Sequence, residues 1–233
     1  MISYNITSLS SLSRSLLKFR YLRIKYTWIV AKNSYGILKR MLDITVSFTL
    51  LIFLIPLFLI VALWIIKIDK GPVLFWQERV GKWGKRFMLP KFRSMYVGAD
   101  KKKQSMLKKN NHTDSITFKM RNDPRITPVG KIIRKLSIDE LPQLWNVLKG
   151  EISLVGPRPA TVTEVSQYNL NERRRLDITP GITCIWQVSG RGDIPFKKQV
   201  KLDVIYIETC SFFIDLKILL LTIPAVISGK GAY

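Results

Sequence analysis

Histidine, cysteine and acidic residues are scarce in this sequence. Among its 233 residues it has one histidine, His112, and two cysteines, Cys184 and Cys210. A lone histidine in a polar stretch argues against a histidine-based catalytic triad and against a zinc site with histidine ligands. Two cysteines do not build a disulfide framework, and they are compatible with a reducing compartment.

Basic residues far outnumber the acids: 38 Lys and Arg against 16 Asp and Glu give a formal net charge of +22. A charge this large predicts a polyanionic partner, which is nucleic acid, an anionic membrane leaflet or phosphorylated substrates. No recognition helix or nucleic-acid-binding motif accompanies the basic residues, so we expect no nucleic acid partner.

The first 36 residues contain no acid and are rich in serine, arginine and lysine. This composition imitates a transit peptide. It also allows a basic amphipathic helix that lies on lipid headgroups, with Leu12, Leu16, Phe19 and Arg20. We favour the surface helix and predict a basic N-terminal extension over residues 1–36.

A long apolar run extends from residue 44 to residue 66, interrupted by Thr45, Ser47, Thr49 and Pro56. As a helix it would be about 34 Å long, which is enough to cross a hydrocarbon core. Both flanks are rich in Lys and Arg, so both are expected on the cytoplasmic side. Pro56 kinks the axis near the middle. The sequence therefore predicts a re-entrant membrane helix hairpin over residues 37–67, broken at Pro56, rather than a straight span.

Residues 68–233 are predicted to form a compact cytosolic catalytic domain on the membrane surface, of the α+β class and mainly helical. Residues 73–76 and 86–89 alternate around a glycine-bounded turn and predict a small β-hairpin. A further strand is expected at residues 182–188, after a turn that places Gly181 at positive φ.

Helices are predicted at three further places in this domain. One begins at Pro128 after the N-cap Thr127, one extends beyond Pro159 to about Leu176, and one runs from Pro195 to about Glu208. Residues 97–117 are polar and lysine-rich and are expected to form a solvated loop. The apolar residues 216–227 are too few to span a membrane, so they pack on the core or lie at the interface.

Two adjacent acids, Asp139 and Glu140, open the stretch that organises the rest of the chain. After them an apolar face is formed at helical spacing by Leu141, Leu144, Trp145 and Leu148. Ser137 and Glu140 match a capping box, which would make Glu140 structural. That register, however, places Pro142 too deep in the helix, whereas a start between Ile138 and Glu140 puts it in the tolerant first turn.

The later start leaves both acids at the positive end of a helix, where ionised carboxylates are favoured. Such acids suit a nucleophile or a metal ligand better than a proton donor, although a cap with a surface acid remains the simpler alternative. Guanidinium groups suit phosphate oxygens, and arginines gather near Gly- and Pro-rich turns at Arg93, Arg125, Arg134 and Arg158. Two phosphates would repel a carboxylate nucleophile, so we expect Mg²⁺ to screen them.

Motifs spread over the chain support a resemblance to a known family. They are Lys39-Arg40-x-x-Asp43, Gly71-Pro72-Val73-Leu74-Phe75, Gln77-Glu78-Arg79-Val80-Gly81, Lys91-Phe92-Arg93-Ser94-Met95, Asp139-Glu140-Leu141-Pro142-Gln143-Leu144, Asn146-Val147-Leu148-Lys149-Gly150 and Gly156-Pro157-Arg158-Pro159. In this order they resemble the bacterial sugar transferases, the monotopic phosphoglycosyl transferases that initiate exopolysaccharide, capsule and O-antigen synthesis. The resemblance covers about residues 38–233.

The resemblance implies transfer of a hexose 1-phosphate from a UDP-sugar to undecaprenyl phosphate, with release of UMP. Asp139 would form a covalent phosphosugar intermediate, Glu140 would orient groups or relay a proton, and both would hold Mg²⁺. Phosphate or substrate contacts are implied for Arg134 and Arg158, and less specifically for Lys91, Arg93, Gln187 and Arg191. The break at Pro56 matches the re-entrant helix of the family.

The resemblance also implies a place on the bacterial inner membrane with the catalytic domain facing the cytoplasm. Membrane lipids are then partners, and the sequence leaves open whether the chain acts as a homodimer. Departures from the family pattern are few: Cys184 stands where glycine is usual, and Glu151 and Ile152 replace the usual Asp and Met. Two alternatives remain open, a glycosyl transferase that releases UDP and a non-enzymatic basic membrane adaptor.

Overall fold

The computed structural model describes residues 11–99 and 123–231. Most of the predicted loop at 97–117 and His112 lie outside these ranges. The chain divides into two compact units, Met1–Met41 and Leu42–Tyr233. The first unit holds the start of helix α1 (Ser11–Phe53), so residues 11–36 of the N-terminal extension are helical. The second unit is mainly helical with two small sheets, which confirms the predicted α+β class.

A bend separates α1 from α2 (Ile55–Ile68). Pro56 lies in the first turn of α2, where its missing N–H does no harm, and the break falls at Leu54. Within the described residues, no single helix is both long and apolar enough to cross a bilayer. The segments Ser34–Phe53 and Ile55–Ile68 reach that length together and are bent by 59°. The apolar segment is therefore bent as predicted, and the break lies at Leu54, two residues before Pro56.

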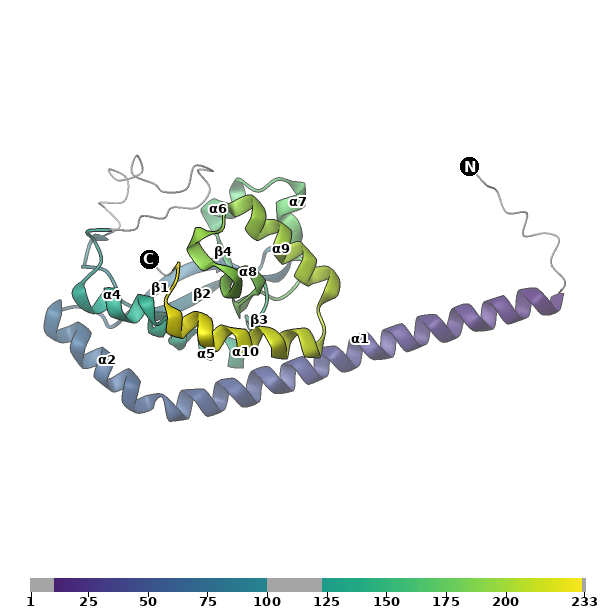
Figure 1. Cartoon of the computed structure of the whole chain (residues 1–233), viewed down its shortest axis with the longest axis horizontal. Coiled ribbons are helices and arrows are strands. Elements are labelled where there is room, and N and C mark those ends of the chain that lie inside the picture. The colour runs from purple at the N-terminus through teal and green to yellow at the C-terminus, as the bar shows by residue number, and fades with distance from the viewer. Residues whose placement is uncertain (1–10, 100–122, 232–233) are drawn as a thin grey trace. The chain divides into compact units, whose positions relative to one another are not determined.

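The bent segment of the second unit packs on the rest of that unit with one face (Figure 1). Val61 and Ile65 of α2 are buried against Phe92, Val129 and Ile133. Near the end of α1, Asp43 Oδ1 accepts hydrogen bonds from Leu154 N at 2.9 Å and from Ser153 Oγ at 3.0 Å. The acid of the Lys39-Arg40-x-x-Asp43 motif thus attaches α1 to the strand that holds Leu154.

The predicted hairpin is confirmed, and its strands are longer than expected. Strands β1 (Leu74–Val80) and β2 (Arg86–Phe92) pair antiparallel around the short 3-10 helix η2 (Lys82–Gly84). The two-residue strand β4 (Ala160–Thr161) adds to β1 and gives the order β2-β1-β4. Strand β2 also packs on residues 138–143, the turn that carries Asp139 and Glu140. The hairpin therefore positions Lys91, which lies on β2, against that turn.

The segment after the hairpin follows its capping signals. Helix α4 (Pro128–Lys135) begins where Thr127 accepts a hydrogen bond from Gly130 N at 2.9 Å. Next come the 3-10 helix η4 (Ile138–Gln143) and helix α5 (Leu144–Lys149), and Gly150 ends α5 at φ 81°. Trp145 is half-exposed, contrary to the predicted apolar face, because η4 winds with three residues per turn and shifts the phase of α5.

A second, parallel sheet pairs β3 (Ser153–Val155) with β5 (Gly181–Thr183). The expectation of positive φ at Gly181 is wrong, because Gly181 begins β5 in extended conformation. Its lack of a side chain has another reason: a Cβ on Gly181 would lie 2.1 Å from Gly156 N. Gly156 and Gly181, neither of which has a side chain, thus allow the backbone segments that hold them to approach closely.

The last third of the chain differs from the sequence prediction in two places. A single helix to Leu176 was expected, but capping boxes at Thr161 and Asn169 start new helices, α6 (Val162–Ser166) and α7 (Leu170–Arg173), before the 3-10 helix η5 (Arg174–Leu176). The predicted strand at 182–188 becomes the end of β5 and helix α8 (Ile185–Ser189). The 3-10 helix η6 (Arg191–Asp193) comes next. Helix α9 (Phe196–Thr209) confirms its prediction, and α10 (Phe212–Ser228) contains the apolar residues 216–227.

Candidate active site

The adjacent acids occupy the first turn of η4. Ser137 precedes them at φ 54°, a left-handed conformation that is uncommon for a residue other than glycine, and its hydroxyl caps nothing. The capping-box alternative is thereby excluded. Asp139 is buried, with 9% of its surface exposed, while Glu140 is partly buried.

Glu140 is paired with a lysine from the hairpin. Lys91 Nζ donates a hydrogen bond to Glu140 Oε1 at 2.5 Å, and little of either side chain reaches solvent. The positive charges of Lys91 and Arg158 outweigh burial and lower the pKa of Glu140 to about 2. Burial in turn lowers the pKa of Lys91. Glu140 is therefore ionised at every physiological pH.

Asp139 has the opposite perturbation. Burial, together with the neighbouring charge of Glu140, raises the pKa of Asp139 to about 6, although Lys91 and Arg134 act in the opposite direction. The expectation that the helix end favours the ionised form is outweighed here, because η4 is one short 3-10 segment and Asp139 is nearly desolvated. Asp139 is still mainly ionised above neutral pH, and it is a more basic carboxylate than an exposed aspartate.

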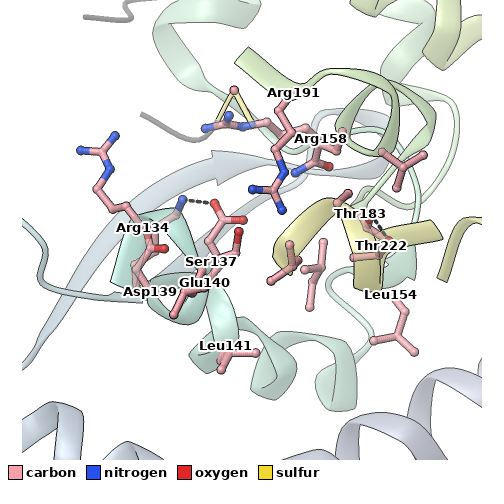
Figure 2. A pocket seen from close by; sticks show the side chains of 18 of the residues that line it. Arg134, Ser137, Asp139, Glu140, Leu141, Leu154, Arg158, Thr183, Arg191 and Thr222 are labelled. Atoms are coloured by element: carbon pink, nitrogen blue, oxygen red, sulfur yellow. Dashed lines mark hydrogen bonds and ion pairs between the residues drawn. The ribbon is translucent and has the colours of Figure 1, made fainter. Parts of the chain in front are cut away.

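Arginines surround the acids on several elements. Arg158 lies beside the acids and lowers the pKa of Glu140. Arg191 sits at φ 51° and, as Figure 2 shows, reaches toward Glu140; its Nη1 is buried without a hydrogen-bond partner among the described residues. Arg79 is buried, donates to the carbonyl of Pro159 at 2.9 Å, and has its pKa lowered by burial to about 10. Arg79 thus holds the loop that presents Arg158.

These residues line one cavity of about 430 Å³ (Figure 2). Seven of the eight polar residues predicted at the site share this cavity, namely Lys91, Arg134, Asp139, Glu140, Arg158, Gln187 and Arg191. They come from segments far apart in the sequence. The size is within the range typical of small-molecule sites, about 300–1,000 Å³.

Arg93, the eighth predicted residue, is placed elsewhere. It is buried, its Nη2 donates to the carbonyl of Asp69, and it lies 3.7 Å from the Asp69 carboxylate at the end of α2. A Cβ on Gly71 would lie 2.2 Å from Arg93 Nη1, so the Gly71-Pro72 motif makes room for this guanidinium. We therefore assign Arg93 to the attachment of α2 rather than to substrate.

Several cavity residues were missed by the sequence reasoning. Asp123 was not considered, although it lines the cavity in a bidentate ion pair with Arg125 at a shortest distance of 2.5 Å. Arg125 itself was named in the sequence as a possible phosphate ligand. Thr183 and Thr222 share a hydrogen bond of 2.8 Å between β5 and α10, and no local pattern predicts that contact.

Cys184, one of the three departures from the family pattern, lies next to a predicted site residue. It is fully buried, and its thiol donates to Gln187 Oε1 at 3.1 Å. Burial raises the pKa of the Cys184 thiol, so it stays protonated and keeps this donor. The contact orients the Gln187 amide at the cavity wall.

Asp139 and Glu140 are the candidate ligands for Mg²⁺. In the described part of the chain, no cluster of three or more His, Cys, Asp or Glu side chains surrounds a single point. The two acids offer adjacent carboxylates, and Mg²⁺ is commonly held by one or two carboxylates together with substrate phosphates and waters. The residues therefore fit a magnesium ion that arrives with phosphate, and they do not form an all-protein cage.

The sequence matches the family model described as bacterial sugar transferase over residues 34–229. The chain belongs to the bacterial sugar transferase family. It is 48% identical over 215 residues to the galactosyl transferase CpsE of Streptococcus agalactiae, a match that covers 91% of this chain and 47% of the relative. It is 42% identical over 212 residues to the undecaprenyl-phosphate galactose phosphotransferase of Salmonella typhimurium, covering 88% of this chain and 43% of the relative.

A shorter relative matches over most of its own length. The exopolysaccharide production protein ExoY of Sinorhizobium fredii is 40% identical over 201 residues, which cover 85% of this chain and 89% of that protein. The chain spans less than half the length of the Streptococcus and Salmonella relatives. The family membership confirms the resemblance inferred from the motifs.

Proposed function

We propose that this sugar transferase moves a hexose 1-phosphate from a UDP-sugar to undecaprenyl phosphate and releases UMP, as the first membrane step of polysaccharide synthesis. The observation that carries the proposal is the pair of adjacent carboxylates, with Asp139 buried and Glu140 bound to Lys91, in a cavity lined by cations. The names of the relatives, an undecaprenyl-phosphate galactose phosphotransferase among them, support the acceptor and the reaction class.

Asp139 is the proposed nucleophile. Its ionised carboxylate attacks the phosphorus next to the sugar, the bond from that phosphorus to the bridging oxygen of UMP breaks, and an acyl phosphate forms on Asp139. A phosphate oxygen of the lipid then attacks the same phosphorus, which frees the carboxylate and yields a lipid diphosphate sugar. A raised pKa suits this role, because a more basic carboxylate is the better nucleophile and is still ionised at neutral pH.

Glu140 is proposed to orient groups rather than to relay protons. A general acid or base works best with a pKa near the operating pH, whereas Lys91 and Arg158 lower the pKa of Glu140 to about 2. The side chain is also held by its hydrogen bond to Lys91. Of the two roles left open by the sequence, orientation of substrate or metal therefore fits the structure better.

Charge neutralisation falls to the surrounding cations. Arg158 and Arg191, with its unpartnered Nη1, are proposed to bind phosphate oxygens, and Arg134 to bind substrate at the edge near Asp139. Gln187 is proposed to contact the donor. Asp139 and Glu140 would hold Mg²⁺, which would supply positive charge that offsets the repulsion between the phosphates and the nucleophile.

The bent pair α1 and α2 is proposed to dip into the inner membrane from the cytoplasmic side. Its outer face is apolar and exposed, with Phe48, Ile52, Leu59, Ile60 and Leu63 among the residues that reach solvent. Helix α2, with 14 residues, is about 21 Å long. With both arms equally inclined and bent by 59°, the apex lies about 10 Å deep, a third of the hydrocarbon thickness of about 30 Å.

The test is an assay of the by-product with the membrane-extracted protein. Undecaprenyl phosphate, Mg²⁺ and a panel of UDP-hexoses are supplied, and UMP and UDP are measured separately. We expect UMP that depends on both substrates and on Asp139. Release of UDP instead would establish a glycosyl transferase, and activity unchanged in Asp139→Asn would refute the mechanism. Asp177→Asn, at an exposed site, is the matched control for charge.

A further inference from the structure

The cavity has an apolar half that the proposed chemistry does not use. Opposite Arg158 and Arg191, its wall is aliphatic, as Leu141 and Leu154 show in Figure 2. Apolar residues that line the cavity include Val46 of α1, Leu141, Leu144, Leu154 and Leu219 of α10, and these five belong to one hydrophobic cluster.

Two of the contributing helices connect this wall with apolar outer surfaces. Leu50 lines the cavity and still has 38% of its surface exposed, and it belongs to the α1 segment with an exposed apolar face. On α10, Leu219 and Val226 face the cavity, while Leu220 and Ile223 of the same helix are about 60% exposed. The apolar half of the cavity is therefore bounded by helices whose other sides are also apolar and exposed.

The chemistry of the two substrates decides which one needs this wall. A UDP-sugar consists of a base, two sugars and a diphosphate, and its polar groups would be left unpaired against leucine and valine. A polyprenyl phosphate joins an anionic head directly to an apolar chain. Its phosphate has to reach the phosphorus held at Asp139, so its first carbons have to lie beside that carboxylate.

We propose that the apolar half of the cavity, between α1 and α10, binds the first isoprene units of the lipid phosphate acceptor. This inference rests on the proposed function. The phosphate lies at the end of the cavity that carries Asp139 and Glu140, and the chain leaves along Leu50 and Val226 toward the bilayer. A cavity of about 430 Å³ holds only the start of a long chain, so the remainder stays among the lipids.

A matched pair of substitutions on one helix tests the inference. Ala225→Trp fills the apolar half of the cavity, and Leu220→Trp adds the same side chain on the exposed side of α10. In bilayer nanodiscs we expect Ala225→Trp to raise the KM for undecaprenyl phosphate more than tenfold, and Leu220→Trp to behave as wild type. First-turnover release of UMP without acceptor is the internal reference, because it reports the donor step alone.

Three results are decisive. Equal acceptor KM values for Ala225→Trp and Leu220→Trp would overturn the inference while leaving the proposed function intact. Selective loss of first-turnover UMP release in Ala225→Trp would also overturn it, since the wall would then serve the donor. Absence of UMP release by the wild-type protein would instead refute the proposed function itself.

A measurement on the wild-type protein avoids any folding defect of the variants. Geranyl phosphate, with two isoprene units, and ethyl phosphate are compared as acceptors that discharge the preformed intermediate. We expect geranyl phosphate to reach half-maximal discharge at a concentration at least tenfold lower. Equal concentrations for the two acceptors would overturn the inference, because a wall that binds isoprene units has to favour the longer chain.

Discussion

Lys91→Met removes the cation that pairs with Glu140, and its effect can be worked out from the site. Lys91 Nζ lies 2.5 Å from Glu140 Oε1, with side chains 18% and 25% exposed. Removing one partner of a buried ion pair costs about 3–5 kcal/mol of unfolding free energy, and the partial exposure favours the lower limit of about 3 kcal/mol. Lys131→Met, on the exposed side of α4, loses the same charge and should cost almost nothing.

The same substitution should shift the pH dependence of turnover. Lys91 lowers the pKa of both acids, so its loss raises both, and Asp139, whose pKa is about 6, then ionises at higher pH. Because the nucleophile acts only when ionised, the acid limb of UMP release should move to higher pH. Lys91→Arg keeps the charge and should restore most of the wild-type profile.

The measurements are rates of UMP release between pH 5 and 9 and urea unfolding in detergent at several pH values. Glu140 has a lowered pKa in the folded protein, so its pairing stabilises the fold above its ordinary pKa of 4.5 and is lost as the pH falls toward 2. The stability difference between wild type and Lys91→Met should therefore be largest at pH 7 and shrink in acid. An unchanged acid limb in Lys91→Met would contradict the electrostatic account of the site.

Three further outcomes are expected. Asp139→Asn should abolish turnover and yet stabilise the fold by up to about 3 kcal/mol at pH 8. The reason is that the raised pKa of Asp139 disfavours its ionised form in the folded state above pH 6. Urea unfolding at pH 8 and pH 4 checks this, with no gain in stability expected at pH 4. Cys184→Ala should raise the KM for the donor several-fold by releasing Gln187, whereas Cys184→Ser keeps a donor and should stay close to wild type. Chelation of Mg²⁺ should stop first-turnover UMP release, and added Mg²⁺ should restore it; release that persists without the ion would remove it from the mechanism.

Local sequence signals were sufficient to predict the elements whose ends carry a proline, a glycine or a capping residue. The hairpin is predicted by its Gly-Lys-Trp-Gly turn, α4 by its Thr127-Pro128 start, and the bend by Pro56. The capping box at Ser137 was disfavoured because it places Pro142 too deep in the helix. The structure has no capping box, but for another reason: Ser137 is left-handed and its hydroxyl caps nothing, whereas η4 does begin at Ile138 and keeps Pro142 inside it. For the hairpin, α4 and the bend, the deciding group is a proline, a glycine or a cap whose effect extends over one turn.

Elements that depend on distant contacts were misjudged. Residues 182–188 are apolar and were predicted as one strand, but only β5 finds a partner, in β3, so the rest winds into α8. Arg93 shares its motif with Lys91, yet the two side chains have different partners: Lys91 meets Glu140 in the cavity, and Arg93 meets Asp69 at the end of α2. The perturbed pKa of Asp139 was likewise invisible, because burial is a property of the assembled fold.

The attachment of α1 through Asp43 has a consequence for anyone who exchanges parts between relatives. Its carboxylate fixes both the rotation and the height of α1 against β3, and each inserted residue would turn a helix by about 100° and lengthen it by about 1.5 Å. The number of residues from Asp43 to Pro56 thus sets the distance along α1 between its attachment to β3 and the apex of the bend. If the bend dips into the membrane as proposed, a chimera that changes the length of this interval would hold an intact catalytic domain at the wrong height for the proposed lipid acceptor.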